Sequence, residues 1–288
     1  MTTPSVSFEF FPPQSLEASF RLWDTVHVLA PLQPRFVSVT YGAGGTTRDL
    51  TREAVATLHK TAGLPVAAHL TCVDATRAET LAIAQDFATA GVTDIVALRG
   101  DPPKGTDGFV AHPDGFASSV DLIEGLNAAG DFNIRVGAYP DTHPEAADAQ
   151  ADVTYLKRKF EAGASEALTQ FFFEADTYFR FRDACEKAGI DKPVTPGILP
   201  IENWKGAVRF AKKCGTHIPS WVVDAFEKAE RDRREDLLAT AICAELCSDL
   251  IDGGVDTLHF YTLNRPELTR DVCHALGVTP KLDLKNVA

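Results

Sequence analysis

Eight short apolar runs recur along this chain of 288 residues, and a longer amphipathic stretch follows each of them. Their Val, Ile, Phe and Thr content is typical of strands that are buried on both faces of a parallel sheet. This alternation predicts an α/β fold of the (β/α)₈ TIM-barrel type, and the lack of a recognisable crossover break favours it over a doubly wound sheet. The expected strands span residues 6–11, 36–40, 65–72, 94–100, 134–140, 166–173, 193–200 and 257–263.

Residues with helical periodicity fill the intervals between the expected strands. In the segment 145–162, Val153, Leu156 and Phe160 form an apolar stripe that should pack against the sheet. Residues 219–254 form a helical insertion, which adds extra helices before the last strand. No long linker interrupts the pattern, so we expect residues 1–288 to form a single barrel domain. The other expected helices span 17–30, 49–62, 76–90, 117–129, 176–188, 203–214 and 266–275.

Charge and composition exclude several classes of protein. The net charge of −12 argues against general affinity for nucleic acid or acidic membranes. No run of 18 apolar residues is present, so we expect no membrane span, and the N-terminus does not have the pattern of a signal peptide. The six cysteines are scattered without a CxxC motif. We interpret them as buried thiols of a cytoplasmic protein, and we expect no metal site.

In a (β/α)₈ barrel, polar residues at the carboxyl ends of the strands are the candidates for an active site. Glu9 is the most unusual of them, because it lies among phenylalanines where an unpaired carboxylate would be costly to bury. Walker A, GxGxxG and serine-elbow motifs are absent, and no expected strand contains a lysine. The groups that remain suit an organic cofactor with a phosphate tail and a heterocyclic substrate. They are Glu9, Asp101, Tyr41, Tyr139, Gln170, Arg99, Arg158, Lys159 and Arg265. The expected strand ends and the loops after them also carry Thr40, His69, His143, His259 and Tyr261.

Nine short motifs occur in order between about residues 5 and 278, namely SFEFFPP, FVSVTYGAGG, HLTC, ALRGDPP, AYPDTHPEA, LKRKFEAGA, TQFFF, PGILP and HFYTLNRPE. Together they resemble the methylenetetrahydrofolate reductase family in its short bacterial type. The resemblance implies a FAD-containing barrel that reduces 5,10-methylenetetrahydrofolate to 5-methyltetrahydrofolate with NAD(P)H, by ping-pong hydride transfer. Two alternatives stay open: the same flavoenzyme working mainly in reverse as a methyltetrahydrofolate oxidase, and a non-catalytic flavin- or folate-binding barrel.

The resemblance also implies roles for two acidic residues. Glu9 matches the proposed general acid of the family, which protonates a poorly basic ring nitrogen so that the folate ring opens to an iminium ion. We expect the neighbouring phenylalanines to raise the pKa of Glu9 and keep it protonated. Asp101 matches an aspartate that contacts flavin and folate, and its carboxylate would favour the developing cation.

The other site residues are implied by the resemblance alone. For folate or NAD(P)H they are Thr40, Asp101, Gln170, Phe210 and Arg265. Asp152 and Lys159 lie two helical turns apart, so their face should present Arg158 and Lys159 to a pyrophosphate while Asp152 binds a ribose hydroxyl. For FAD the residues are Tyr41, Ala43, His69, Arg99, Gly100, Asp101, Ala117, Tyr139, His143, Ala146, Asp152, Arg158 and Lys159.

Three residues depart from the family pattern. Tyr155 stands where Asn is usual, Gly206 where Gln is usual and Phe116 where Tyr is usual. These changes bear on the affinities for FAD and folate and leave the catalytic residues intact. We expect no counterpart of the regulatory domain that binds S-adenosylmethionine in the long eukaryotic form. Family members are commonly homo-oligomers, and we expect the same of this chain.

Overall fold

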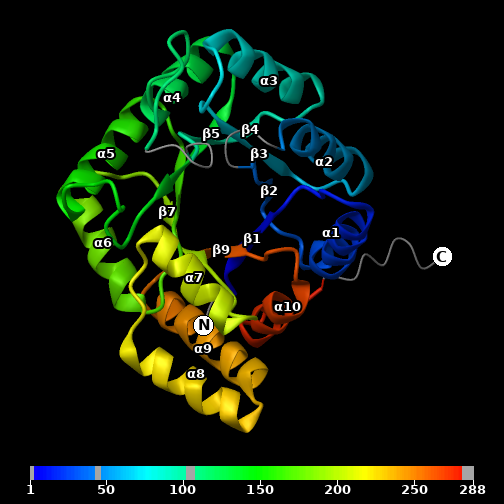
Figure 1. The fold of residues 1–288 in the computed structure, drawn as a ribbon, viewed down its shortest axis with the longest axis vertical. Coiled ribbons are helices and arrows are strands. Elements are labelled where there is room, and N and C mark those ends of the chain that lie inside the picture. The colour runs from blue at the N-terminus through cyan, green and yellow to red at the C-terminus, as the bar shows by residue number, and fades with distance from the viewer. Residues whose placement is uncertain (1–2, 43–46, 102–107, 281–288) are drawn as a thin grey trace.

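A computed structural model describes residues 3–42, 47–101 and 108–280 of the chain, and Figure 1 shows a ring of helices around a central sheet. In this part of the chain the strands are all parallel, and strands that are neighbours in sequence are neighbours in the sheet, except β7 and β8. The strands are β1 (Ser5–Phe10), β2 (Val37–Val39), β3 (Val66–Thr71), β4 (Asp94–Leu98), β5 (Asn133–Ala138), β6 (Glu166–Thr169), β7 (Val194–Thr195), β8 (Gly197–Ile198) and β9 (Thr257–Tyr261).

The expected seventh strand is divided at Pro196 into β7 and β8, and this division closes the ring. β7 pairs with β6 on one side, β8 pairs with β9 on the other, and β9 pairs with β1. Pro196 has no N–H, but its carbonyl still accepts a hydrogen bond of 3.0 Å from the His259 amide. The barrel prediction is therefore confirmed, and the doubly wound alternative is wrong because the strand order never reverses.

Helices follow the strands and cover the outer face of the barrel (Figure 1). The expected insertion 219–254 consists of two helices, which separate at Arg233 with a left-handed φ of 55°. The helices are α1 (Leu16–Leu29), α2 (Arg48–Thr61), α3 (Arg77–Thr89), α4 (Ser119–Ala129), α5 (Ala149–Glu161), α6 (Ala175–Lys187), α7 (Trp204–Cys214), α8 (Ser220–Asp232), α9 (Glu235–Asp252) and α10 (Pro266–Ala275), with a short 3₁₀ helix at Ala30–Leu32.

Alternation along β1 separates the apolar core from the barrel interior. Phe8 and Phe10 are 0% and 1% exposed and belong to the core between the strands and the helices. Ser7 and Glu9 therefore point to the inside of the barrel. This arrangement explains how a carboxylate can lie between phenylalanines without contacting the apolar core. A smaller apolar cluster fills the barrel interior and consists of Phe36, Ala67, Val96 and Leu168, with Leu98 packed against it.

An ion cluster closes the amino end of the barrel. Arg135 of β5 donates from Nε to Glu166 at 2.9 Å and also pairs with Asp94. The second carboxylate oxygen of Glu166 accepts from Arg35 at 3.0 Å and from the Thr195 hydroxyl at 2.6 Å. Burial raises the pKa of Glu166, but these partners outweigh burial and lower it. Removal of this carboxylate would leave the buried Arg135 guanidinium with Asp94 as its only charged partner among the described residues.

We expect Glu166→Gln to lower the free energy of unfolding by about 3 kcal/mol, since the buried Arg135 loses one of its two charged partners and Arg35 loses its contact with the same carboxylate. A suitable control is Glu17→Gln on α1, where Glu17 and its partner Arg21 are 81% and 60% exposed and the expected loss is under about 0.5 kcal/mol. Urea unfolding at neutral pH measures both. The Glu166 pKa is lowered on folding, so its contribution exists above the ordinary carboxyl pKa and disappears as the pH falls through the folded value. Equal losses for the two variants would contradict this assignment.

Candidate active site

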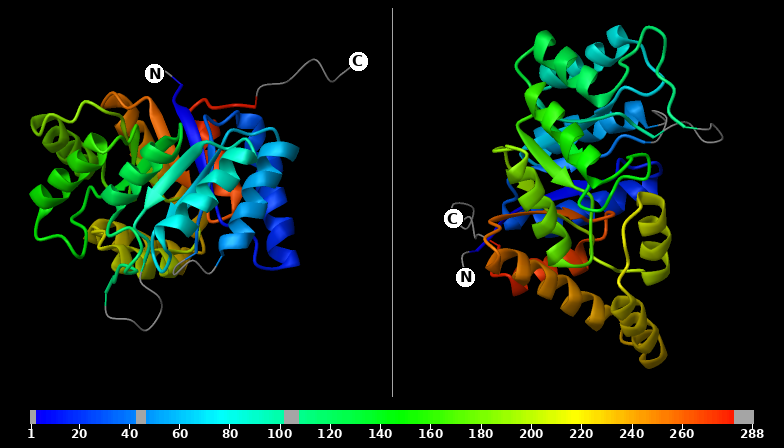
Figure 2. Two further views of the ribbon diagram at one scale, coloured as in Figure 1. Left: turned by 90° about the horizontal axis from the view of Figure 1, so that it is seen from above. Right: turned by 90° about the vertical axis from the view of Figure 1, so that its left-hand side faces the viewer.

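A cavity of about 790 Å³ lies at the carboxyl ends of the strands. In the left view of Figure 2, β1 runs from the top of the barrel towards the side on which the yellow helices after β8 lie. The cavity extends from the end of β1 across the barrel to α5 and α7. Fourteen of the predicted site residues line it: Glu9, Thr40, Tyr41, His69, Arg99, Gly100, Asp101, Tyr139, His143, Ala146, Asp152, Lys159, Gln170 and Phe210.

Three predicted site residues do not line the cavity. Arg158 is exposed on α5, with its guanidinium 5.6 Å from the Tyr155 ring, so only Lys159 of this pair faces the cavity. Ala117 lies in the turn before α4, where its amide donates to Asp121 at 2.9 Å. Arg265 precedes α10 and pairs with Glu202 at 3.4 Å. Ala43 lies outside the residues that the structure describes.

Glu9 lies between two histidines on neighbouring strands of the barrel. Its Oε2 atom is 3.3 Å from His69 Nε2 on β3 and 3.9 Å from His259 Nε2 on β9. Burial raises the pKa of Glu9, but His259 and His69 outweigh it and lower the pKa to about 2. The expectation of a raised pKa is therefore wrong, because Phe8 and Phe10 face the outer core and imidazoles surround the carboxylate. In this state of the site Glu9 is ionised.

The rim of the cavity holds two ion pairs that the sequence did not reveal. Asp101 pairs with Lys213 of α7 at 3.0 Å, and both side chains are largely exposed. Arg99 instead makes a two-pronged contact with Glu145, at 2.5 and 3.0 Å. Glu145 lies in the loop after β5, between the predicted residues His143 and Ala146, but nothing in the sequence pointed to Arg99 as its partner. Lys213 lies near the end of α7, and only the assembled barrel brings it next to Asp101.

Lys159 brings a positive charge into the cavity from α5. Its Nζ atom donates to the Gly137 carbonyl at 2.8 Å and lies 5.1 Å from the centre of the Tyr155 ring. Burial lowers the pKa of Lys159 from 10.5 to about 8, although Asp152 acts in the opposite direction. The Asp152 carboxylate accepts from the His143 amide at 2.7 Å, so it orders the loop beside Lys159.

Aromatic side chains shape the walls of the cavity. Phe210 of α7 stacks on Phe171, with ring centroids 5.2 Å apart. Tyr261 crosses the barrel and donates to the Thr169 carbonyl at 2.5 Å. It passes over Gly197, where an added Cβ would lie only 2.0 Å from the same carbonyl oxygen and 2.6 Å from the tyrosine ring. The glycine of β8 therefore provides the space in which Tyr261 closes the seam of the barrel.

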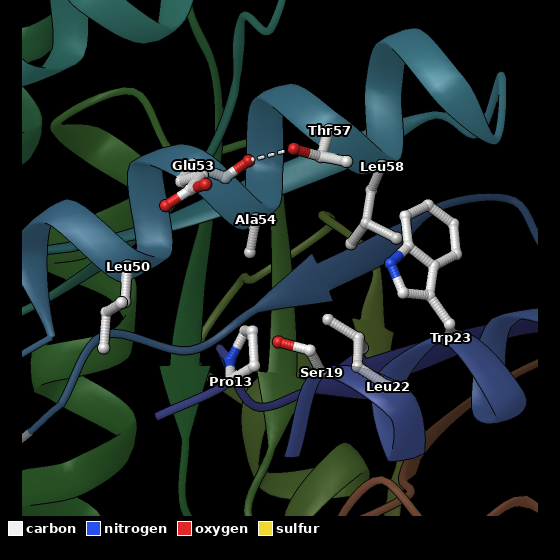
Figure 3. Close-up of a pocket in the computed structure, with 9 residues that line it drawn as sticks. All are labelled: Pro13, Ser19, Leu22, Trp23, Leu50, Glu53, Ala54, Thr57 and Leu58. Carbon is white, nitrogen blue, oxygen red and sulfur yellow. Dashed lines mark hydrogen bonds between the residues drawn. The ribbon is translucent and has the colours of Figure 1, made fainter. Parts of the chain in front are cut away.

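A second cavity, of about 190 Å³, lies between α1 and α2 on the outside of the barrel (Figure 3). Leu22, Trp23 and Leu58 belong to its apolar wall, and the Thr57 hydroxyl donates within α2 to the Glu53 carbonyl at 2.7 Å. Glu53 is the single titratable residue in its lining. This cavity lies between two helices outside the barrel and offers Glu53 no second titratable group, so the larger cavity is the candidate active site.

No group of three or more His, Cys, Asp or Glu side chains in the described residues is arranged to hold a metal ion. The neighbours Cys243 and Cys247 on α9 are buried free thiols, as expected. Burial raises the pKa of Cys247 well above its ordinary value. Among the described helices none is long and apolar enough to cross a membrane.

A barrel with a polar cavity at the carboxyl ends of its strands has the layout of the (β/α)₈ enzymes. The methylenetetrahydrofolate reductase family model matches residues 1–277. The 5,10-methylenetetrahydrofolate reductase of Salmonella typhimurium is 47% identical over 279 residues, which cover 96% of this chain and 92% of that protein. The Escherichia coli reductase is 46% identical with the same coverage. The chain therefore belongs to the methylenetetrahydrofolate reductase family and is of its short bacterial type.

Solved structures of low sequence identity share the fold. One is an uncharacterized protein from Clostridium thermocellum that binds two copies of 5-methyl-5,6,7,8-tetrahydrofolic acid, with a TM-score of 0.63 and 15% identity. The match covers 96% of this chain and 95% of that chain. A 2,3-dimethylmalate lyase follows with a TM-score of 0.52 and 12% identity. At such identities the likeness concerns the barrel architecture alone.

We expect Lys159 to titrate near pH 8 in the protein without bound ligand, because burial disfavours its charged form. As the pH rises through this value the ammonium loses its proton, and the cavity loses one positive charge. Labelling with [ε-¹³C]lysine and following the ¹³C resonances against pH measures the titration. The Lys159→Arg variant identifies the resonance by removing it. Titration of every lysine near 10.5 would contradict the assignment.

Proposed function

We propose that this chain is a flavin-dependent reductase that converts 5,10-methylenetetrahydrofolate to 5-methyltetrahydrofolate with NAD(P)H. The observation that carries the proposal is the position of Glu9 at the floor of the large cavity, next to His69 and His259. An acid at that point can act on a substrate that enters from the carboxyl ends of the strands. Membership of the family supports the reaction and its substrate class.

The cavity residues fit FAD as the resident cofactor. Lys159 and His143 provide positive or hydrogen-bonding groups for a pyrophosphate on the α5 side, and Asp152 can accept from a ribose hydroxyl. Tyr139, which packs edge-on against His143 with centroids 4.5 Å apart, and Arg99 extend this side towards the centre of the barrel. When bound, FAD would supply the hydride carrier between the nicotinamide and the folate.

The remaining part of the cavity fits the two substrates in turn. Gln170 and Thr40 offer an amide and a hydroxyl, and Phe210 offers a ring face to a nicotinamide or a pterin. Asp101 can accept hydrogen bonds from the amino-pyrimidine edge of the pterin after its ion pair with Lys213 breaks. The Clostridium thermocellum protein of the same fold binds 5-methyl-5,6,7,8-tetrahydrofolic acid, which is consistent with a folate in a barrel of this shape.

The proton chemistry belongs to Glu9. Opening of the five-membered folate ring requires a proton on the leaving nitrogen, so that the C–N electron pair can stay on nitrogen. Glu9 must therefore gain a proton before or during substrate binding, since its pKa of about 2 keeps it ionised in the free site. A bound folate that displaces water and contacts the carboxylate raises its pKa by further desolvation.

We expect the purified chain to bind FAD and become yellow. Lys159→Met should weaken FAD binding at least about tenfold, because it removes a charged contact to the pyrophosphate. Arg158→Met, one residue away but directed to solvent, should change the affinity less than about twofold. Quenching of flavin fluorescence measures all three affinities. A chain that stays colourless after incubation with FAD would refute the flavoenzyme assignment.

We expect Glu9→Gln to separate the two half-reactions. The amide cannot protonate the folate nitrogen, so folate reduction should fall by about 10²–10⁴-fold, whereas reduction of the flavin by NAD(P)H should stay within about twofold. Anaerobic rapid-mixing experiments with each substrate alone measure the two rates. As a control, Glu53→Gln in the small outer cavity should leave both unchanged. Equal loss of both half-reactions in Glu9→Gln would contradict the acid role.

A further inference from the structure

The proposed reaction leaves one buried histidine without a role. His259 of β9 is fully buried, and its ring stacks on Phe36 with centroids 5.7 Å apart. Tyr261 meets the same ring edge-on at 5.3 Å. These contacts fix the plane of the imidazole, so its two nitrogen atoms have fixed directions inside the barrel.

Ser7 determines which nitrogen of His259 carries the proton in the neutral ring. The Ser7 oxygen lies 2.8 Å from His259 Nδ1, and the Ser7 hydroxyl donates to the Leu258 carbonyl at 3.4 Å. Because its own hydrogen is used in that bond, the serine oxygen accepts from Nδ1–H. The neutral ring therefore has a bare Nε2, which is an acceptor.

This Nε2 atom faces Glu9 without a hydrogen-bond partner among the described residues. It lies 3.9 Å from the Glu9 carboxylate, a distance at which two acceptors repel unless a proton lies between them. A buried polar atom without a partner costs about 1–3 kcal/mol. Protonation of Nε2 removes that cost and creates a charge-assisted contact with the carboxylate.

We propose that His259, oriented by Ser7, stores the proton that Glu9 delivers to the folate, an inference that rests on the reductase function proposed above. The ionised Glu9 carboxylate first takes the proton from Nε2 after an approach of about 1 Å. Glu9 then gives this proton to the leaving ring nitrogen, the C–N bond breaks, and the electron pair stays on nitrogen. His259 ends as the neutral ring that Ser7 stabilises, and it is a positioning residue because it acts through Glu9.

The other charged or titratable groups near this pair have different surroundings. His69 faces the same carboxylate from β3 at 3.3 Å, and its Nε2 atom is also buried without a hydrogen-bond partner among the described residues, but its side chain lines the cavity. Burial raises the pKa of Tyr261 well above its ordinary value, and its hydroxyl donates to Thr169. Arg135 lies across the Phe36 ring from His259, with its guanidinium 4.0 Å from the ring centre. His259 is thus the proton carrier that ligands do not reach.

Two variants test the proposal. In His259→Gln, the Glu9 pKa should rise from about 2 by at least one unit, since one imidazole is lost and burial remains. Infrared difference spectra against Glu9→Gln follow this carboxyl in the whole protein without any folate. In Ser7→Ala, folate reduction should slow about tenfold and its pH profile should shift, while flavin reduction by NAD(P)H stays within about twofold.

Ser38→Ala is the matched control. Ser38 is buried on β2 as the register partner of Glu9, and its hydroxyl has no hydrogen-bond partner in the described part of the chain. This variant should leave the Glu9 titration and both half-reactions unchanged. Identical effects of Ser7→Ala and Ser38→Ala, or an unchanged Glu9 titration in His259→Gln, would overturn the proposal. The titration needs no turnover, so its result stands apart from the reductase assignment.

Discussion

A charged side chain inside a closed barrel has to find its partner there, because the wall of strands and helices separates it from water. This constraint operates at both ends of the interior. At the amino end the Glu166 carboxylate accepts hydrogen bonds from Arg135, Arg35 and Thr195. The Arg135 guanidinium of this cluster packs against the Phe36 ring. At the carboxyl end Glu9 has only imidazoles near it, so the carboxylate is stabilised but not fully satisfied. The interior therefore holds paired charges at its amino end and an incompletely paired carboxylate at its carboxyl end, where the candidate active site lies.

Most of the fold could be predicted because apolar runs in the sequence indicate buried strands and apolar residues at helical spacing indicate helices. The eight runs correspond to the strands of the structure, but the pattern did not reveal the division at Pro196. A two-residue strand on each side of a proline is too short to leave a periodic signal. The insertion 219–254 was recognised as helical, but the position of its break depends on the left-handed turn at Arg233.

The candidate site was predictable to the extent that its residues lie at strand ends. Glu9, His69, Tyr139 and Gln170 come together because the strands are parallel and in register. The pKa of Glu9 was not predictable, since the neighbours that set it come from β3 and β9, about 60 and 250 positions away. Side chains on helices were predicted less well, because successive residues of a helix differ in direction by about 100°. For this reason Lys159 faces the cavity, whereas Arg158, the residue before it, is exposed to solvent.

The seam between β7 and β8 has a mechanical consequence for the cavity. Each of these segments contributes only two residues to the ladder, so this part of the wall has the fewest hydrogen bonds to hold it. Segments that are held by few backbone hydrogen bonds open locally more readily than segments that are held by many. Tyr261 crosses that joint above Gly197, and α7, which carries Phe210 and Lys213 to the cavity, begins six residues after β8 ends. The helix that brings Phe210 and Lys213 to the cavity therefore follows the part of the wall with the shortest strands, and the same seam is tied to the ion cluster through Thr195 of β7, whose hydroxyl donates to Glu166.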